Sequence, residues 1–274
     1  MRVLDTYQDN LNEALHKDGH QNWYRLVLHD FNNGKQFEGV IHPHETWSEP
    51  SSIPEPEFRG VRGQGDIEEN RKRATRRAKK KIRHACKSAQ FDRMITLTTR
   101  DAIFDRGEFQ KMIEAFVRHV RKATGNKLPY VVVIEKHDSE KTSEAKRGSL
   151  HAHMAVRGRQ EYKLLQSIWN FRICGGRGFV HVNNGTKNMN PGRIASYISK
   201  YISKSISDVP LNKKSYWISQ NIPAPIKTVK LFKTFTEALS WLIELYDSKG
   251  ASWGFERWRC WQDTELDVLW LPAG

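Results

Sequence analysis

Residues 149–156 read Ser-Leu-His-Ala-His-Met-Ala-Val and place two histidines, His151 and His153, on either side of one small apolar residue. The apolar neighbours predict a buried strand. Because side chains at positions i and i+2 of a strand face the same side, both imidazoles can point at one metal ion. Two core histidines without a metal are the alternative, which this segment alone does not exclude.

A second segment, residues 197–204, reads Tyr-Ile-Ser-Lys-Tyr-Ile-Ser-Lys. It predicts a helix that begins at Pro191, since proline favours the first helical position. Tyr197 and Tyr201 then share a face about one turn apart, beside a stripe of isoleucines. Aromatic packing is one interpretation. A metal site followed by a tyrosine helix instead indicates phosphoryl transfer with tyrosine as the attacking group.

Three segments in this order resemble the motifs of the HUH endonucleases, specifically the rolling-circle replication initiators of phages and plasmids. They are Met94-Ile95-Thr96-Leu97-Thr98-Thr99, His151-Ala152-His153 and Tyr197-x-x-Lys200-Tyr201-x-x-Lys204. The two-tyrosine third motif is similar to that of the phage replication gene A proteins. The resemblance covers roughly residues 90–206. It implies an enzyme that nicks single-stranded origin DNA, forms a 5′-phosphotyrosine link, leaves a free 3′ hydroxyl and rejoins strands.

The hydrophobic pattern predicts an α+β fold, a central antiparallel sheet of about five strands with flanking helices, and the resemblance implies the same fold. Expected strands are the histidine strand and residues 93–99, 130–135 and 179–182, and expected helices are residues 67–90, 107–123, 160–171, 235–246 and the tyrosine helix. Residues 23–29 and 37–42 alternate like a hairpin across Asn33-Gly34.

These elements suggest three parts of the chain. Residues 1–66 form an N-terminal extension that contains the hairpin. Residues 67–210 form the nicking domain with a leading basic helix. Residues 211–274 form a helical, tryptophan-rich C-terminal extension, which we expect to pack on the same domain because tryptophan is highly buried on average.

A metal ion held by His151 and His153 needs a third ligand. Glu135 ends an apolar strand, and antiparallel pairing of that strand with the histidine strand would bring its carboxylate to the imidazoles. Alternatives are a strand-end glutamate in solvent or paired with the next lysine, and His137 or Asp138 as the ligand. The resemblance also implies a Glu or Gln here. Two imidazoles and one carboxylate suit Mg²⁺ or Mn²⁺ bound together with a phosphate oxygen.

His42-Pro43-His44 repeats the spacing of the histidine pair. Proline cannot donate a hydrogen bond to a central ladder, so we do not expect a buried strand here. We therefore predict that this second pair does not bind the metal.

Tyrosine is a poor nucleophile at neutral pH because its pKa is about 10. A metal that neutralises the scissile phosphate and a nearby ammonium would both lower that barrier. Lys200 and Lys204, each three residues after a tyrosine, are candidates for this charge. A solvated helix face is the alternative for both lysines.

The formal net charge of +14 favours a polyanionic partner, most simply nucleic acid. Ten cations and no acid lie between Arg71 and Lys87, where like charges four residues apart repel one another on a helix. A phosphate backbone would relieve this repulsion. The expected DNA-binding residues are Arg71, Arg73, Arg76, Arg77, Lys79, Lys80, Lys81 and Arg83, and the resemblance adds Thr98.

The sequence also argues against several other classes. It contains no apolar stretch of transmembrane length and no apolar segment typical of a signal peptide near Met1. Its three scattered cysteines fit a reducing interior, so we expect the cytoplasm of a bacterial host cell. There is no Gly-x-x-x-x-Gly-Lys-Ser/Thr motif, so an initiator of this kind would rely on a host helicase as well as a host polymerase.

Three other functions remain open. A transposase or a conjugative relaxase of the same superfamily would share the chemistry, although most such transposases use one tyrosine. A non-catalytic DNA-binding regulator would use the histidines structurally. A metal hydrolase acting on a small substrate would not need the strong positive charge.

Overall fold

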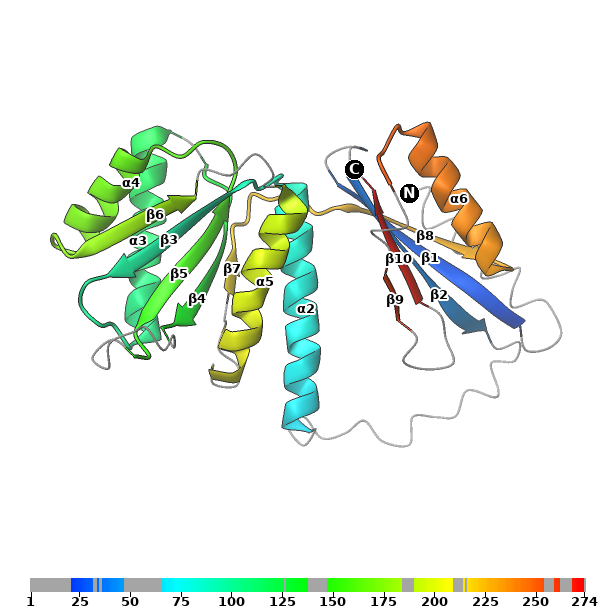
Figure 1. Ribbon diagram of the computed structural model, residues 1–274, viewed down its shortest axis with the longest axis horizontal. Coiled ribbons are helices and arrows are strands. Elements are labelled where there is room, and N and C mark those ends of the chain that lie inside the picture. The colour runs from blue at the N-terminus through cyan, green and yellow to red at the C-terminus, as the bar shows by residue number, and fades with distance from the viewer. Residues whose placement is uncertain are drawn as a thin grey trace. The chain divides into compact units, whose positions relative to one another are not determined.

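The computed structural model describes residues 21–31, 34, 36–46, 66–125, 127–137, 147–183, 190–208, 214, 216–253, 259–261 and 268–273. The chain divides into two compact units (Figure 1). We call Gly65–Ala224 the central unit, and Met1–Gln64 together with Pro225–Gly274 the terminal unit. Sheets and helices build both units, which confirms the predicted α+β class. Among the described residues, no helix is both long and apolar enough to cross a membrane.

The central unit is built on a five-stranded antiparallel sheet with the order β6-β3-β5-β4-β7. Its strands are β3 (Arg93–Thr99), β4 (Val131–Lys136), β5 (Leu150–Val156), β6 (Gly178–Asn183) and β7 (Tyr216–Ile218). The histidine strand, β5, is the middle strand, and all its residues are buried. The predicted sheet of about five antiparallel strands is therefore confirmed, and three-residue β7 completes it.

Three helical elements pack on one face of this sheet: α3 (Arg106–Thr124), α4 (Tyr162–Ser167) and the π-helix η3 (Ile168–Ile173). The carboxylate of Asp105 caps the start of α3 by accepting from the Glu108 N–H at 2.6 Å, and Gly125 ends it with a left-handed φ of 65°. Trp169 of η3 is fully buried, and its indole N–H donates to the Thr98 carbonyl oxygen at 2.7 Å. That bond fixes η3 to β3.

The other face of the sheet carries α2 (Ile67–Ser88) and α5 (Pro191–Asp208), which pack on one another and on β4. The core between them and the sheet is apolar, with Ile82 of α2 and the isoleucines of α5, Ile194, Ile198 and Ile202, all fully buried. Because the isoleucines hold one side of α5 against the sheet, the tyrosines lie on the adjacent stripe of this helix.

The terminal unit is a second antiparallel sheet, with the order β8-β1-β2-β10-β9. Its elements are β1 (Gln21–Phe31), β2 (Gln36–Thr46), β8 (Ile226–Phe232), α6 (Phe235–Ser248), β9 (Arg259–Trp261) and β10 (Val268–Ala273). The predicted hairpin of β1 and β2 is confirmed. We expected residues 211–274 to pack on the nicking domain. Instead, β8 pairs with β1, and β10 pairs with β2.

His42-Pro43-His44 lies within β2, contrary to the expectation from its proline. The segment pairs with β1, whereas the pairing of β10 with β2 extends only as far as Ile41. Pro43 therefore lies on an edge portion of the described sheet, where a missing N–H is tolerated. His42 and Pro43 are half-buried. The side chain of His44 lies outside the described residues, so the absence of a metal at this pair stays a prediction.

Candidate functional site

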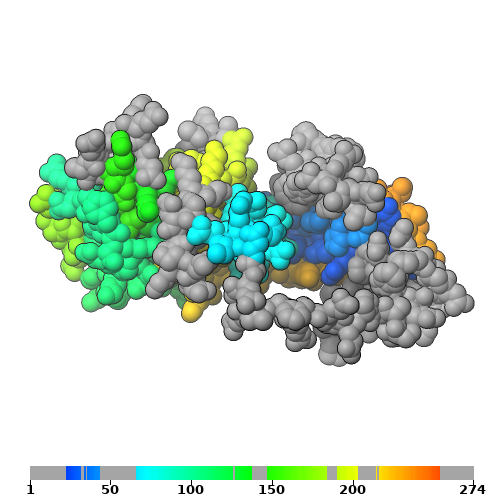
Figure 2. Space-filling view, turned by 90° about the horizontal axis from the view of Figure 1, so that it is seen from below, coloured from blue at the N-terminus to red at the C-terminus, as the bar shows by residue number. Residues whose placement is uncertain are grey.

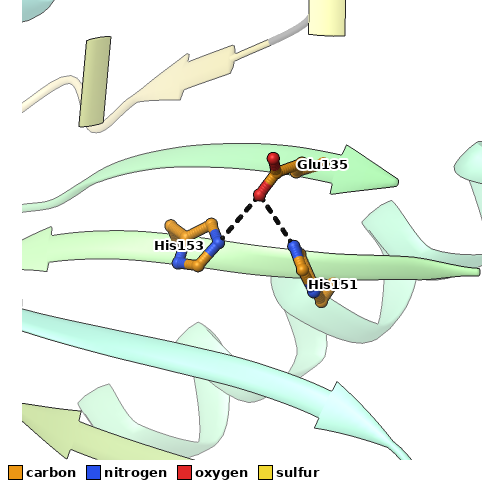
Figure 3. Close-up of side chains that lie close together, drawn as sticks. All are labelled: Glu135, His151 and His153. Atoms are coloured by element: carbon orange, nitrogen blue, oxygen red, sulfur yellow. Dashed lines mark hydrogen bonds and ion pairs between the residues drawn. The ribbon is translucent and has the colours of Figure 1, made fainter. Parts of the chain in front are cut away.

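Glu135, His151 and His153 converge on the face of the central sheet that carries α2 and α5, which we call the site face (Figure 3). Glu135 pairs directly with His151 across β4 and β5. One carboxylate oxygen, Oε2, lies 2.9 Å from Nε2 of His151 and 3.2 Å from Nε2 of His153. The possible ligand atoms of the three residues all lie within 4.8 Å of one another. The structure thus brings the expected ligands together in a buried group that could hold a metal ion.

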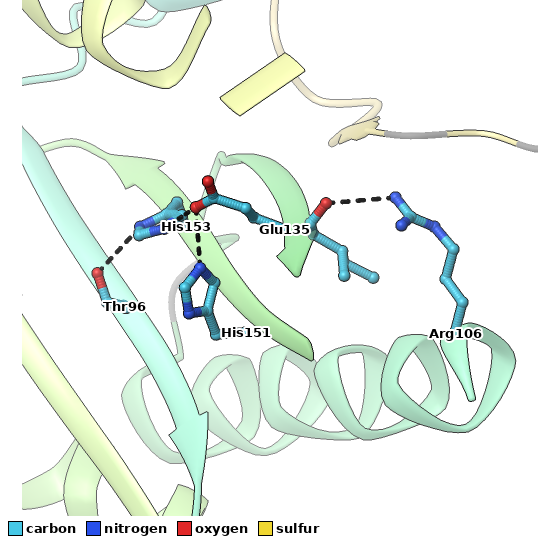
Figure 4. A network of polar contacts seen from close by, with 6 residues as sticks. Thr96, Arg106, Glu135, His151 and His153 are labelled. Carbon is cyan, nitrogen blue, oxygen red and sulfur yellow. Dashed lines mark hydrogen bonds and ion pairs between the residues drawn. The ribbon is translucent and has the colours of Figure 1, made fainter. Parts of the chain in front are cut away.

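Two further residues orient this triad, and sequence reasoning gave neither of them this role (Figure 4). Thr96 Oγ1 lies 3.2 Å from Nδ1 of His153. A histidine that binds a metal through Nε2 keeps its proton on Nδ1, so the Thr96 hydroxyl would accept that proton's hydrogen bond. The guanidinium of Arg106, on α3, donates to the Ile134 carbonyl oxygen at 3.4 Å and ties β4 to the helix behind it.

The charge of the triad suits a divalent cation. Burial acts to raise the pKa of Glu135, but hydrogen bonds from His151 and His153, together with their charge, outweigh burial and lower this pKa to about 2. The carboxylate is therefore ionised at neutral pH. An anionic oxygen and two imidazole nitrogens in one buried cluster form a donor set that fits Mg²⁺ or Mn²⁺.

The alternative ligands for this site have separate outcomes. The ring of His137 lies against that of His151, with 4.4 Å between the ring centroids, but His137 does not belong to the ligand group. Asp138 lies outside the described residues. Glu135 is the acidic member of the cluster within the described part of the chain.

The two tyrosines of α5 continue outward from the triad. The ring of Tyr201 stacks on His153, and the ring of Tyr197 meets Tyr201 edge-on, with 5.3 Å between their centroids. Tyr201 is half-buried, whereas Tyr197 is 44% exposed. Burial is the main cause that raises the pKa of Tyr201, followed by a hydrogen bond with Tyr197 and the charges of Tyr197 and Glu135. Both phenols therefore adjoin the candidate metal centre, and Tyr197 is the more accessible one.

The two lysines of the tyrosine motif differ in what the structure describes. Lys200 is exposed on α5, three residues after Tyr197 and so on a neighbouring part of the helix surface. Lys204 also lies within α5, but its side chain is outside the described residues.

The basic run lies on α2, which forms part of the surface seen in Figure 2 (cyan). Of the expected DNA-binding residues, Arg73, Arg76, Arg77, Lys80 and Lys81 are exposed, and Arg71, Lys79 and Arg83 are half-buried. An ion pair with Glu69 at 3.2 Å engages Arg73. Thr98 is half-buried on β3, where its hydroxyl donates to the Phe179 carbonyl oxygen at 3.3 Å. The helix thus presents cations along its exposed side.

The comparisons with known proteins bear on the same part of the chain. Residues 92–206 match the family model of the replication-associated protein ORF2. This match runs from β3 to α5 and includes the triad and both tyrosines. It supports a replication initiator and a role in DNA replication. No curated protein and no solved structure matches the chain.

Proposed function

We propose that this protein initiates rolling-circle replication by nicking single-stranded origin DNA. The observation that carries the proposal is the stack that joins the nucleophile candidates to the candidate metal centre, Tyr197 on Tyr201 and Tyr201 on His153. The match to a replication-associated family supports the biological role. The resemblance of the three motifs to the HUH endonucleases supplies the reaction type.

In this reaction, Tyr197 is the first nucleophile because its side chain is the exposed one of the pair. Its phenolic oxygen bonds to the scissile phosphorus and gives up its proton, while the bond from phosphorus to the 3′ oxygen breaks and that oxygen gains a proton. A divalent cation bound by the triad would neutralise charge on the phosphate. Lys200 and Lys204 would add positive charge near the phenols.

Tyr201 acts in the second half of the reaction. The phosphotyrosine keeps the energy of the broken phosphodiester, so strands can be rejoined without ATP. A second phenol next to the first allows one tyrosine to hold a 5′ end while the other takes part in rejoining. The contact between the two rings supports such an exchange.

The remaining parts of the proposal concern DNA and the host. The exposed cations of α2 and the hydroxyl of Thr98 would bind the DNA backbone. The free 3′ hydroxyl would be extended by a host polymerase, and a host helicase would unwind the duplex in the bacterial cytoplasm.

A covalent-adduct gel tests the mechanism. Wild type, Tyr197→Phe, Tyr201→Phe and the double variant are incubated with labelled single-stranded fragments of the replicon that encodes the chain, with Mn²⁺ and with or without EDTA. We expect an EDTA-sensitive protein–DNA adduct that the double variant does not form. Tyr162→Phe is the matched control, because Tyr162 is a similarly exposed tyrosine on α4, behind the sheet.

The other outcomes separate the alternatives. DNA binding without any adduct would contradict the proposal and favour a non-catalytic regulator. An adduct from a protein that moves DNA between replicons, but does not support replication of an origin plasmid, would identify a transposase or relaxase instead.

A further inference from the structure

Four residues lie in one row across the site face of the central sheet. Glu135 pairs with His151, and Thr98 pairs with Phe179. Because Leu97 pairs with Ala152, the next residue of β3, Thr98, lies beside His151. The row therefore runs from the triad over Thr98 to Phe179 on the outermost strand, β6.

Phe179 presents its ring to solvent at the end of this row. The next residue, Val180, is fully buried in the core on the opposite face, so strand alternation turns Phe179 toward the site face. The Phe179 side chain is 56% exposed. In the described part of the chain, the helices of the site face pack mainly on β4 and β5, away from β6.

A basic pocket adjoins Phe179. It has a volume of about 430 Å³, and its lining includes Thr98, Phe179, Arg100 and Arg177. Arg177 forms an ion pair with Asp101 at 2.6 Å, in which both side chains are more than half exposed. Exposed ion pairs contribute little to stability, so a phosphate can compete with this carboxylate.

An exposed aromatic ring beside arginines is typical of surfaces that bind single-stranded nucleic acid, where bases stack on rings and cations follow the backbone. We infer that single-stranded DNA crosses the site face from the tyrosines to Phe179, that a base near the scissile phosphate stacks on this ring, and that Arg100 and Arg177 hold the adjoining backbone. Two strand spacings separate β5 from β6, roughly 10 Å, so the stacked base lies close to the nick.

The inference rests on the proposed function for its substrate, because the row begins at the triad and the tyrosines. The net charge of +14 favours a polyanion over an apolar partner at this surface. Phe179 is thus a positioning residue, which sets the place of the strand relative to the attacking phenol.

Equilibrium binding in the Tyr197→Phe/Tyr201→Phe background, which does not cleave, tests this assignment. The probe is a fluorescently labelled single-stranded oligonucleotide that spans the nick mapped by the adduct gel. We expect Phe179→Ala to weaken binding about 5- to 150-fold, the range for loss of one base–aromatic stack. Phe179→Trp should preserve binding, whereas Phe179→Leu should behave like Phe179→Ala.

A scan with single abasic nucleotides identifies the stacked base. In the Phe179-containing protein, loss of one base near the nick should weaken binding, and that penalty should disappear in Phe179→Ala. Phe171→Ala is the matched control, since Phe171 is 68% exposed on η3, which packs against the opposite face. The inference is overturned if Phe179→Ala binds no more weakly than Phe171→Ala, or if the two scans coincide.

The same design separates this inference from the proposed function. If wild type forms no adduct with any fragment, the most tightly bound replicon fragment becomes the probe. A Phe179-dependent base position would then support the binding surface while the nicking mechanism fails. An adduct whose formation and binding ignore Phe179 would give the reverse result.

Discussion

The ring of Tyr201 lies flat on the imidazole of His153, with 3.8 Å between the ring centroids and 10° between the ring planes. This contact joins a residue of the tyrosine helix to a candidate metal ligand on the central strand. Ile198 and Ile202, fully buried beside it, fix α5 against the sheet. Close-packed side chains leave little freedom for either ring, so the candidate nucleophiles and the candidate metal centre share one geometry.

The first prediction concerns metal binding by the triad. Mn²⁺ at about 100 times its Kd should stabilise the folded wild type by about 2.7 kcal/mol, a rise in Tm of roughly 5–10 °C. His153→Ala and Glu135→Gln should lose this shift because each removes a ligand. Thermal unfolding with and without EDTA measures it, and His119→Ala on α3 is the control. An equal shift in His153→Ala would place the metal elsewhere.

The second prediction concerns Thr96. Thr96→Val keeps the shape of the side chain but removes the oxygen that lies 3.2 Å from His153 Nδ1. We expect metal affinity to fall about 10-fold or more, as for other residues that orient metal-binding histidines. Thr96→Ser should retain the affinity. Titration with Mn²⁺, followed by electron paramagnetic resonance, gives both values, and equal affinities for Val and Ser would contradict the assigned role.

The third prediction concerns the exposed cations of α2. Replacing Arg76, Arg77 and Lys81 by Gln should weaken single-stranded DNA binding and lower its dependence on salt. The slope of log K against log salt concentration should fall by about 2, since each phosphate contact on a single strand contributes about 0.7. Anisotropy titrations at several salt concentrations measure the slope.

The control for α2 removes the same charge elsewhere. Lys111, Arg118 and Lys122 are exposed on α3, which packs on the opposite face of the sheet. Their replacement by Gln should change the slope less than replacement of the α2 cations. Equal changes would mean that net charge, rather than this helix, determines DNA binding.

The fourth prediction concerns Gly178, at the start of β6. A Cβ atom there would lie 2.8 Å from Trp169 Cδ1 and 3.0 Å from the Asn170 Cα. Gly178→Ala should therefore lower the free energy of unfolding by about 1–3 kcal/mol, the usual cost of overpacking. Urea denaturation measures it. Gly192→Ala in the first turn of α5 meets only Asn190 Oδ1, at 3.4 Å, and should be neutral or stabilising.

Much of the central unit is predictable from sequence because its elements carry their own patterns. The helical spacing of apolar residues in α3 and the apolar runs of β4 and β5 agree with the elements of the structure. The position of Glu135 beside the imidazoles follows once β4 and β5 pair antiparallel. Short β7 has too few residues to show a period.

The pairing between distant segments is what the sequence pattern leaves open. Nothing local in β8 or β10 indicates β1 and β2 as partners, so the terminal unit was not expected. The roles of Thr96 and Phe179 depend on strand register. Each becomes visible only when β3 is aligned with its neighbours, because the Leu-Thr motif and a single exposed phenylalanine are ordinary strand sequence.

The topology of the terminal unit has a consequence for biosynthesis. β1 and β2 leave the ribosome first, but β8 and β10, the strands that border them, are among the last to be made. The hairpin must therefore wait, with both edges unpaired, while the whole central unit is translated and folds. Ribosome stalling or truncation after α5 would leave those edges open to association with other chains, so the quality of the final segment governs the solubility of the first.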